Sequence, residues 1–166
     1  MPARPLKAVC ALAAAASLAL TAAPAQAATD PDPRVWTDLS TTYQATSAYG
    51  YEPFAVAAGY VRTNDCVANP PVGGMGYHYV KPKYIGSLDP AKPAAVLYED
   101  RGDGKRRLVA VEWMVPDTGQ ATPKLFGEKF QKNELPGHFT LHAWIYKSNP
   151  RGLFYSWNPR VTCPAA

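Results

Sequence analysis

The sequence has few cysteines and little excess charge of either sign, and its one long apolar run lies at the very start. Only 3 of the 166 residues are cysteine, which excludes a domain held together by a dense disulfide network. Hydrophobic residues make up 47% of the chain and charged residues 18%, a balance that excludes a disordered chain. With 12 residues, glycine is too scarce for a collagen-like repeat. The length suits a single globular domain.

The first 27 residues have the pattern of a secretory signal peptide. Arg4 and Lys7 precede an apolar run over residues 8–22, and an Ala-Gln-Ala sequence at residues 25–27 resembles the site that signal peptidase reads. The run is about 15 residues long, whereas a membrane-spanning helix needs roughly 20. This difference disfavours an uncleaved anchor. We therefore predict cleavage after Ala27 and a secreted, extracellular protein.

The predicted mature domain, residues 28–166, carries no marked excess charge. Loss of Arg4 and Lys7 lowers the formal net charge from +4 to +2, so nothing favours nucleic acid or an anionic membrane surface as a partner. Asp100 and Asp103 interleave with a basic cluster, which is typical of a solvated hairpin tip: Arg101, Lys105, Arg106 and Arg107. We expect no nucleic-acid partner, no membrane contact after cleavage, and a monomer.

The mature domain divides into a helical part, residues 34–59, and a β-rich part, residues 75–163. Apolar residues in the first part recur every three or four positions until Gly50, which predicts two short helices or one bent helix. The second part contains four predicted strands, over residues 75–80, 95–99, 107–115 and 139–146. A helical segment packed on a mostly antiparallel sheet of about four strands is an α+β fold.

Two cysteines remain after signal cleavage, Cys66 and Cys163, because Cys10 lies in the removed segment. In an exported protein an even pair predicts one disulfide. A loop of nearly a hundred residues would be closed, worth about 4–5 kcal/mol in the chain-entropy model. The alternative, a metal-binding or redox pair, is disfavoured because no C-x-x-C spacing occurs.

Four polar side chains in the predicted strands are candidate metal ligands: His78, Glu99, Glu112 and His142. Glu112 and His142 each interrupt an apolar strand, where a buried polar group needs a partner. If neighbouring strands bring these groups together, two imidazoles and a carboxylate can hold a divalent transition metal ion. Zinc, iron, copper and manganese all accept such ligands. Without a metal, no cofactor is expected.

Strand alternation also assigns side chains to the two faces of the sheet. Within residues 107–115 it places Val109, Val111 and Trp113 on one face and Glu112 on the other. His138 follows a Pro-Gly pair and is predicted to be an exposed loop residue.

Three interpretations of the four candidate ligands remain open. They could bind metal, form a metal-free acid–base pair, or satisfy one another as a structural network. No H-x-H or H-E-x-x-H spacing strengthens the metal hypothesis. An enzyme built on this group would be a metal-dependent oxidase, dioxygenase or hydrolase. Whether the protein is an enzyme stays open.

Aromatic residues give a second functional hypothesis. The chain has 10 Tyr, 4 Trp and 5 Phe, all after residue 27. Exposed aromatic rings would form a stacking platform for a sugar, as in a carbohydrate- or surface-binding module, whereas buried ones would pack the core. The candidates for binding a small molecule or glycan are Tyr77, Trp144, Tyr146, Tyr155 and Trp157.

Six ordered blocks of sequence carry a family resemblance: MGYHYV at 75–80, LYE at 97–99, VAVEW at 109–113, LHAW at 141–144, NPRGLF at 149–154 and WNPRVTC at 157–163. The series resembles a family of small exported bacterial proteins of uncharacterised function and covers nearly the whole mature chain. The resemblance implies export, a single domain and a Cys66–Cys163 disulfide. It carries over no activity. Together these observations predict a secreted protein that binds a small ligand or divalent metal ion in a His/Glu pocket on its sheet.

Overall fold

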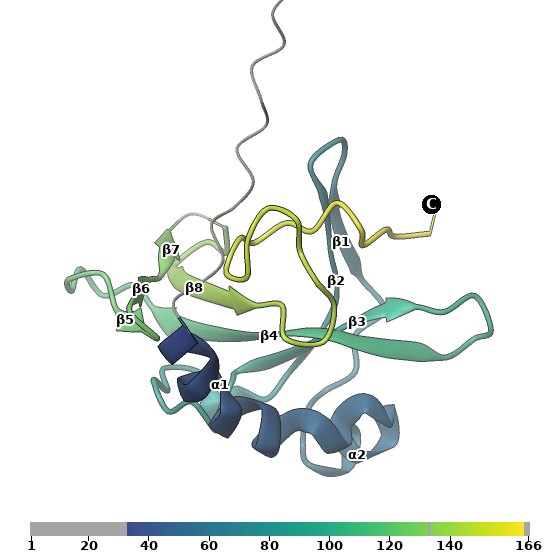
Figure 1. Ribbon diagram of the computed structural model, residues 1–166, viewed down its shortest axis with the longest axis horizontal. Coiled ribbons are helices and arrows are strands. Elements are labelled where there is room, and N and C mark those ends of the chain that lie inside the picture. Colours follow the sequence, from purple (N-terminus) through teal and green to yellow (C-terminus); the bar gives the residue numbers. More distant parts are fainter. Residues whose placement is uncertain (1–32, 133, 165–166) are drawn as a thin grey trace, which may run out of the picture.

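The computed structural model of the chain describes residues 33–132 and 134–164. The predicted signal peptide, residues 1–27, lies outside these residues. Within them, no helix has both the length and the apolar character needed to cross a membrane. Figure 1 shows a curled sheet with the helices α1 and α2 packed along one side.

The helices occupy the first part of the described chain, as predicted. Helix α1 (Pro33–Thr46) continues into a 3-10 helix, η1 (Ser47–Gly50), and α2 (Glu52–Ala57) follows. The break lies at Tyr51, whose backbone is extended with φ −93° and ψ 101°. Proline lies in the first turn of α2, where a missing backbone N–H is tolerated.

The main sheet has six strands in the order β1-β2-β3-β4-β8-β7, and every neighbouring pair is antiparallel. Their bounds are β1 (Cys66–Asn69), β2 (Gly73–Val80), β3 (Ala95–Asp100), β4 (Arg106–Pro116), β7 (Gln131–Lys132) and β8 (His138–Ala143). Two very short strands, β5 (Lys124–Leu125) and β6 (Glu128–Lys129), form a separate hairpin, and η2 (Pro82–Tyr84) is a 3-10 turn.

The four predicted strands correspond to β2, β3, β4 and β8, so the antiparallel sheet is confirmed but the count of about four is too low. The β-rich part begins at Cys66 rather than at residue 75, and its last strand ends at Ala143. The two missed strands lie at the edges of the sheet. They are only four and two residues long, too short for an alternating pattern to show.

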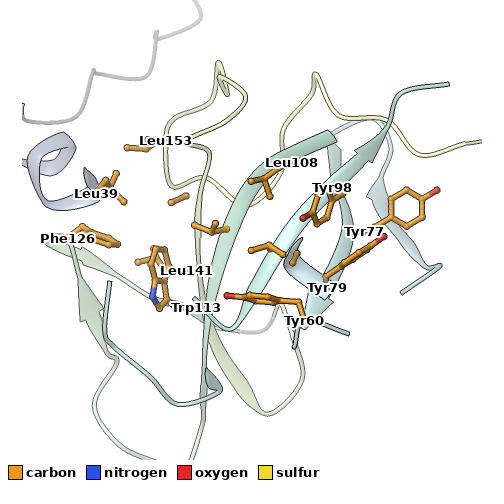
Figure 2. Close-up of a cluster of buried hydrophobic side chains, with 14 of the residues drawn as sticks. Leu39, Tyr60, Tyr77, Tyr79, Tyr98, Leu108, Trp113, Phe126, Leu141 and Leu153 are labelled. Carbon is orange, nitrogen blue, oxygen red and sulfur yellow. The ribbon is translucent and has the colours of Figure 1, made fainter. Parts of the chain in front are cut away.

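The two faces of the sheet have separate cores. The helix face carries a large cluster that includes Tyr98, Trp113 and Leu141 and packs against Leu39 of α1. Figure 2 shows these side chains together with the ring of Phe126. The opposite face, named the pocket face because Met75 and Met114 of its core line a pocket, carries a smaller cluster that includes Leu97, Ala110, Met114, Trp144 and Val161.

A bulge between β3 and β4 corrects one face assignment. Leu97 pairs with Ala110, but the next residue, Tyr98, pairs with Leu108, so Val109 is an extra residue in β4. Such a bulge shifts the alternation of all residues beyond it. Val109 therefore packs in the pocket-face cluster, and the prediction that it shares a face with Trp113 is wrong. Glu112 does lie on the face of the sheet opposite to that of Trp113, as predicted.

The C-terminal segment runs from β8 back to the first strand. Asn158 forms an isolated bridge with Gly74 of β2, and Cys163 forms a disulfide with Cys66 of β1, 97 positions earlier. The predicted disulfide is thereby confirmed. Glycine is required at residue 74, because a Cβ there would lie 2.7 Å from the carbonyl oxygen of Val161.

Candidate metal centre

Three strands place His78, Glu112 and His142 together on the pocket face. Glu112 of β4 lies directly opposite His142 of β8. His78 belongs to β2, which is separated from β4 by β3. The β3 residue opposite Glu112 is Ala95, and the one opposite His78 is Leu97, so His78 and Glu112 meet diagonally across β3.

The ligand atoms of these three residues converge. His78 Nε2 lies 3.5 Å from Glu112 Oε2, and His142 Nε2 lies 3.6 Å from Glu112 Oε1. One ligand atom from each of the three residues lies within 4.8 Å of the others. Ligands about 2.1 Å from a tetrahedral metal ion are about 3.4 Å apart. The spacing is therefore that of a metal site whose carboxylate stands between two imidazoles, and the group could hold a metal ion.

The group is buried and incompletely hydrogen-bonded. Glu112 is 3% exposed and His142 is fully buried. Among the described residues, only four buried side-chain atoms lack a hydrogen-bond partner: Glu112 Oε2, His142 Nδ1, His142 Nε2 and Thr63 Oγ1. A buried polar atom without a partner costs free energy. Three of the four atoms belong to the candidate ligands, which points to a missing partner at this place.

Burial sets the protonation of the three residues when no ligand is bound. It lowers the pKa of His78 to about 4 and, together with the neighbouring His78, lowers the pKa of His142 to about 3. Burial, with a smaller contribution from the charge of Glu134, raises the pKa of Glu112 to about 8. At neutral pH both imidazoles are neutral, which is the form that binds metals. A metal ion would displace the proton held by Glu112.

Glu134 lies behind His142 and was missed at the level of sequence. Its Oε2 atom lies 3.9 Å from His142 Nδ1 and accepts a hydrogen bond from Thr140 Oγ1 at 3.4 Å. A carboxylate on the far side of a metal-binding imidazole fixes the orientation of the ring. No periodic pattern marks Glu134, because it follows the two-residue strand β7 in an irregular connection. Only the pairing of β7 with β8 brings it close.

A pocket of about 390 Å³ opens over His78 and Glu112. Thr63, Asp65, Glu134 and His138 also line it. His138 is the first residue of β8 and is half-buried, so its prediction as an exposed loop residue is wrong. The structure places it on the pocket wall because its β8 position has the same parity as His142. The rest of the wall is apolar: Val67, Met75, Val80, Ile85, Met114 and Leu135.

Glu99 does not join the candidate ligands. It lies opposite Arg107, accepts a hydrogen bond from Arg107 Nη2 at 2.6 Å, and pairs with Lys147. The physical reason is distance along the strand. Glu99 is four residues beyond Ala95, the β3 residue opposite Glu112, and four extended residues span about 13 Å. The structure therefore assigns Glu99 to an ion-pair cluster at the other end of β3.

The aromatic candidates do not form an exposed platform. Tyr77 is 6% exposed and Trp144 only 2%, and Tyr146 and Trp157 are half-buried. The indole N–H of Trp144 donates to the backbone carbonyl of Tyr155. Among the five, only Tyr155 is an exposed side chain. These rings mainly pack the interior, which was the alternative considered for them.

No family model matches the chain, and no curated protein or solved structure gives a significant match. The resemblance to small exported bacterial proteins therefore stays a prediction. The disulfide is consistent with an extracellular protein.

Proposed function

We propose that the protein binds a divalent transition metal ion through His78, Glu112 and His142. The observation that carries this proposal is the convergence of three ligand atoms within 4.8 Å, in a group where Glu112 and His142 hold buried atoms without hydrogen-bond partners. A metal ion would satisfy Glu112 Oε2 and His142 Nε2 at once. Glu134 would hold His142 through its other nitrogen.

Two imidazoles and one carboxylate leave coordination positions open. This set suits non-haem iron, and it also suits zinc when a water or substrate occupies the remaining position. His78 and Glu112 line the pocket, whereas fully buried His142 lies beneath it. The open positions would therefore face the pocket. That arrangement favours a ligand-binding metal site over a closed structural one.

Metal-free roles are less well supported by the geometry. A structural network would be expected to satisfy its own members, yet neither nitrogen of His142 has a hydrogen-bond partner among the described residues. A metal-dependent oxidase, dioxygenase or hydrolase is the enzymatic form of the proposal, favoured by the pocket over the ligands. A carbohydrate-binding role has less support because four of its five aromatic candidates are buried or half-buried.

Elemental analysis of the mature protein tests the proposal. The protein is exported to a bacterial periplasm without a histidine tag and incubated in turn with zinc, iron(II), copper(II) and manganese(II). About one metal ion per chain is expected for at least one of them. Loss of that metal is expected in Glu112→Gln and His142→Gln.

Matched controls are Glu128→Gln and His138→Gln, which alter the same residue types outside the three ligands and should keep the metal. Near-ultraviolet circular dichroism reports whether each variant is folded. Absence of every metal from the folded wild-type protein would overturn the proposal. So would retention of the metal by both folded ligand variants.

A further inference from the structure

The rim of the pocket is apolar and comes from three separate segments. Val67 of β1, Ile85 after η2 and Leu135 before β8 are 36%, 36% and 37% exposed, and all three line the pocket. Exposed apolar side chains that converge on one opening mark a binding site more often than scattered ones do. The floor continues this character through Met75 and Met114, so the body of a ligand would meet hydrocarbon and thioether groups.

The charged groups of the pocket are acidic. Among the described residues that line it, there is no Lys and no Arg, whereas Asp65 and Glu134 stand on its walls. A carboxylate or phosphate ligand would find no lysine or arginine of the described lining to pair with. The described lining also contains no Tyr, Trp or Phe, the residues that form cages for organic cations. The wall carboxylates disfavour an anionic group, and a bound divalent metal ion would repel an organic cation, so the two together favour an uncharged ligand body.

Thr63 is a neutral polar residue of the pocket wall. Thr63 Oγ1 is shielded from solvent and has no hydrogen-bond partner among the described residues, and Thr63 lines the pocket. A hydroxyl group both donates and accepts, so it suits a neutral polar group. The volume sets the size: a cavity of about 150 Å³ holds benzene, so about 390 Å³ holds one ring with substituents.

We infer that the pocket binds a small organic molecule that presents a donor atom to the metal and whose body, the size of a substituted ring, is apolar and uncharged. The inference rests on the proposed function, because the metal provides one of the contacts. The apolar rim and floor would hold the body of the molecule. Asp65 and Glu134 would repel an anionic group on that body.

Three hydroxamic acids with the same metal-binding head group test this inference. They are acetohydroxamic, benzohydroxamic and 4-carboxybenzohydroxamic acid. Zinc-loaded wild-type protein is first assayed for zinc content and then titrated with each compound by isothermal calorimetry. Benzohydroxamic acid should bind at least about tenfold more tightly than acetohydroxamic acid, since its ring is buried. The 4-carboxy compound should bind at least about tenfold more weakly than benzohydroxamic acid. Titration of free zinc gives the intrinsic preference of the head group.

A charge variant sharpens the test. Ile85→Lys places a cation on the rim and should bring the 4-carboxy compound to within about threefold of benzohydroxamic acid. Leu88→Lys is the matched control, because Leu88 is 44% exposed and is not part of the pocket wall; it should keep the wild-type order.

The outcomes separate the two proposals. If zinc binds but the protein has equal affinities for all three compounds, or binds the 4-carboxy compound most tightly, the inference is overturned. The proposed metal site is then unaffected. Absence of zinc, iron(II), copper(II) and manganese(II) alike from the loaded protein overturns both; if one of the other three binds in place of zinc, the same titrations are run on that form. The wild-type ranking decides the matter even if Ile85→Lys does not fold.

Discussion

The two faces of the same sheet treat their buried polar groups differently. On the helix face, the Tyr98 hydroxyl donates to the carbonyl of Tyr49 at 2.7 Å, and the Trp113 indole N–H donates to the carbonyl of Asp89 at 3.0 Å. On the pocket face, Glu112 and His142 have buried atoms without hydrogen-bond partners among the described residues. The helix face satisfies these polar groups with the chain itself, whereas the pocket face keeps buried polar atoms that no described residue pairs with. The comparison thus separates satisfied polar groups from unsatisfied ones.

The largest contrast is expected at two neighbouring residues of β4. Trp113→Ala removes a fully buried side chain from the helix-face core and should lower the free energy of unfolding by about 3–5 kcal/mol. Met114 faces the pocket, so part of its side chain already lacks packed neighbours before it is truncated in Met114→Ala. Its cost should lie near the lower end of the range for such truncations, about 2 kcal/mol. Urea denaturation measures both. Equal losses would show that the pocket face is packed as completely as the helix face.

Metal binding should stabilise the wild-type protein through the pocket face alone. At a free zinc concentration one hundred times the dissociation constant, linkage gives about 2.7 kcal/mol. Thermal unfolding of chelator-treated protein, with and without zinc, measures the gain. The same zinc concentration should give no gain in stability for Glu112→Met and the full gain for Glu128→Met. A gain that persists in folded Glu112→Met would place the zinc elsewhere.

Much of this architecture could be predicted from the sequence, because β2, β3, β4 and β8 carry alternating or continuous apolar runs. The edge strands β1 and β7 were too short to show a pattern. The bulge at Val109 leaves no trace in residue type, since valine suits a regular strand equally well.

The candidate site was predicted to a similar degree. His78, Glu112 and His142 could be selected because each is a polar residue among apolar ones in a strand. Their convergence depended on strand order and on the register across β3, and neither can be derived from one strand at a time. Glu99 satisfied the same sequence criteria but lies too far along β3. Glu134 lies in an irregular connection whose path only the tertiary structure shows.

Replacing Glu112, the buried acid of the pocket face, by an apolar residue should stabilise the metal-free protein. Glu112→Met keeps a side chain of similar length and removes a buried group with an unpartnered oxygen, so the free energy of unfolding should rise by about 1–3 kcal/mol. Glu99→Met is the control, because Glu99 is bonded to Arg107 and Lys147 and its loss should destabilise. Urea denaturation in the presence of chelator measures both variants. Destabilisation by Glu112→Met would mean that the metal-free group is already satisfied.

Glu134 should act on the metal through His142. Glu134→Gln keeps the size of the side chain but removes the charge that faces His142 Nδ1, and zinc affinity should fall about 10–100-fold. Competition with a chromogenic zinc chelator measures the change. Glu128→Gln, an exposed acid of the β5–β6 hairpin, should leave the affinity unchanged. A stoichiometric site with unaltered affinity in Glu134→Gln would show that His142 is oriented by packing alone.

The smallest effect should come from a satisfied polar group of the helix face. Tyr98→Phe removes the hydrogen bond to Tyr49 and should cost about 0.5–1.5 kcal/mol at neutral pH, opposite in sign to the change expected for Glu112→Met.

The cost of Tyr98→Phe should shrink in alkaline solution. Burial raises the pKa of Tyr98 above its ordinary value of 10, so the native protein keeps this phenol protonated while the unfolded chain releases the proton. The wild type therefore loses stability as pH rises above about 10, and Tyr98→Phe lacks this loss. Urea denaturation of both proteins at pH 7 and at pH values up to about 11 measures the difference. A gap that stayed constant over this range would show that the hydroxyl ionises as easily in the fold as in the unfolded chain. The helix face would then be less tightly closed than its hydrogen bonds indicate.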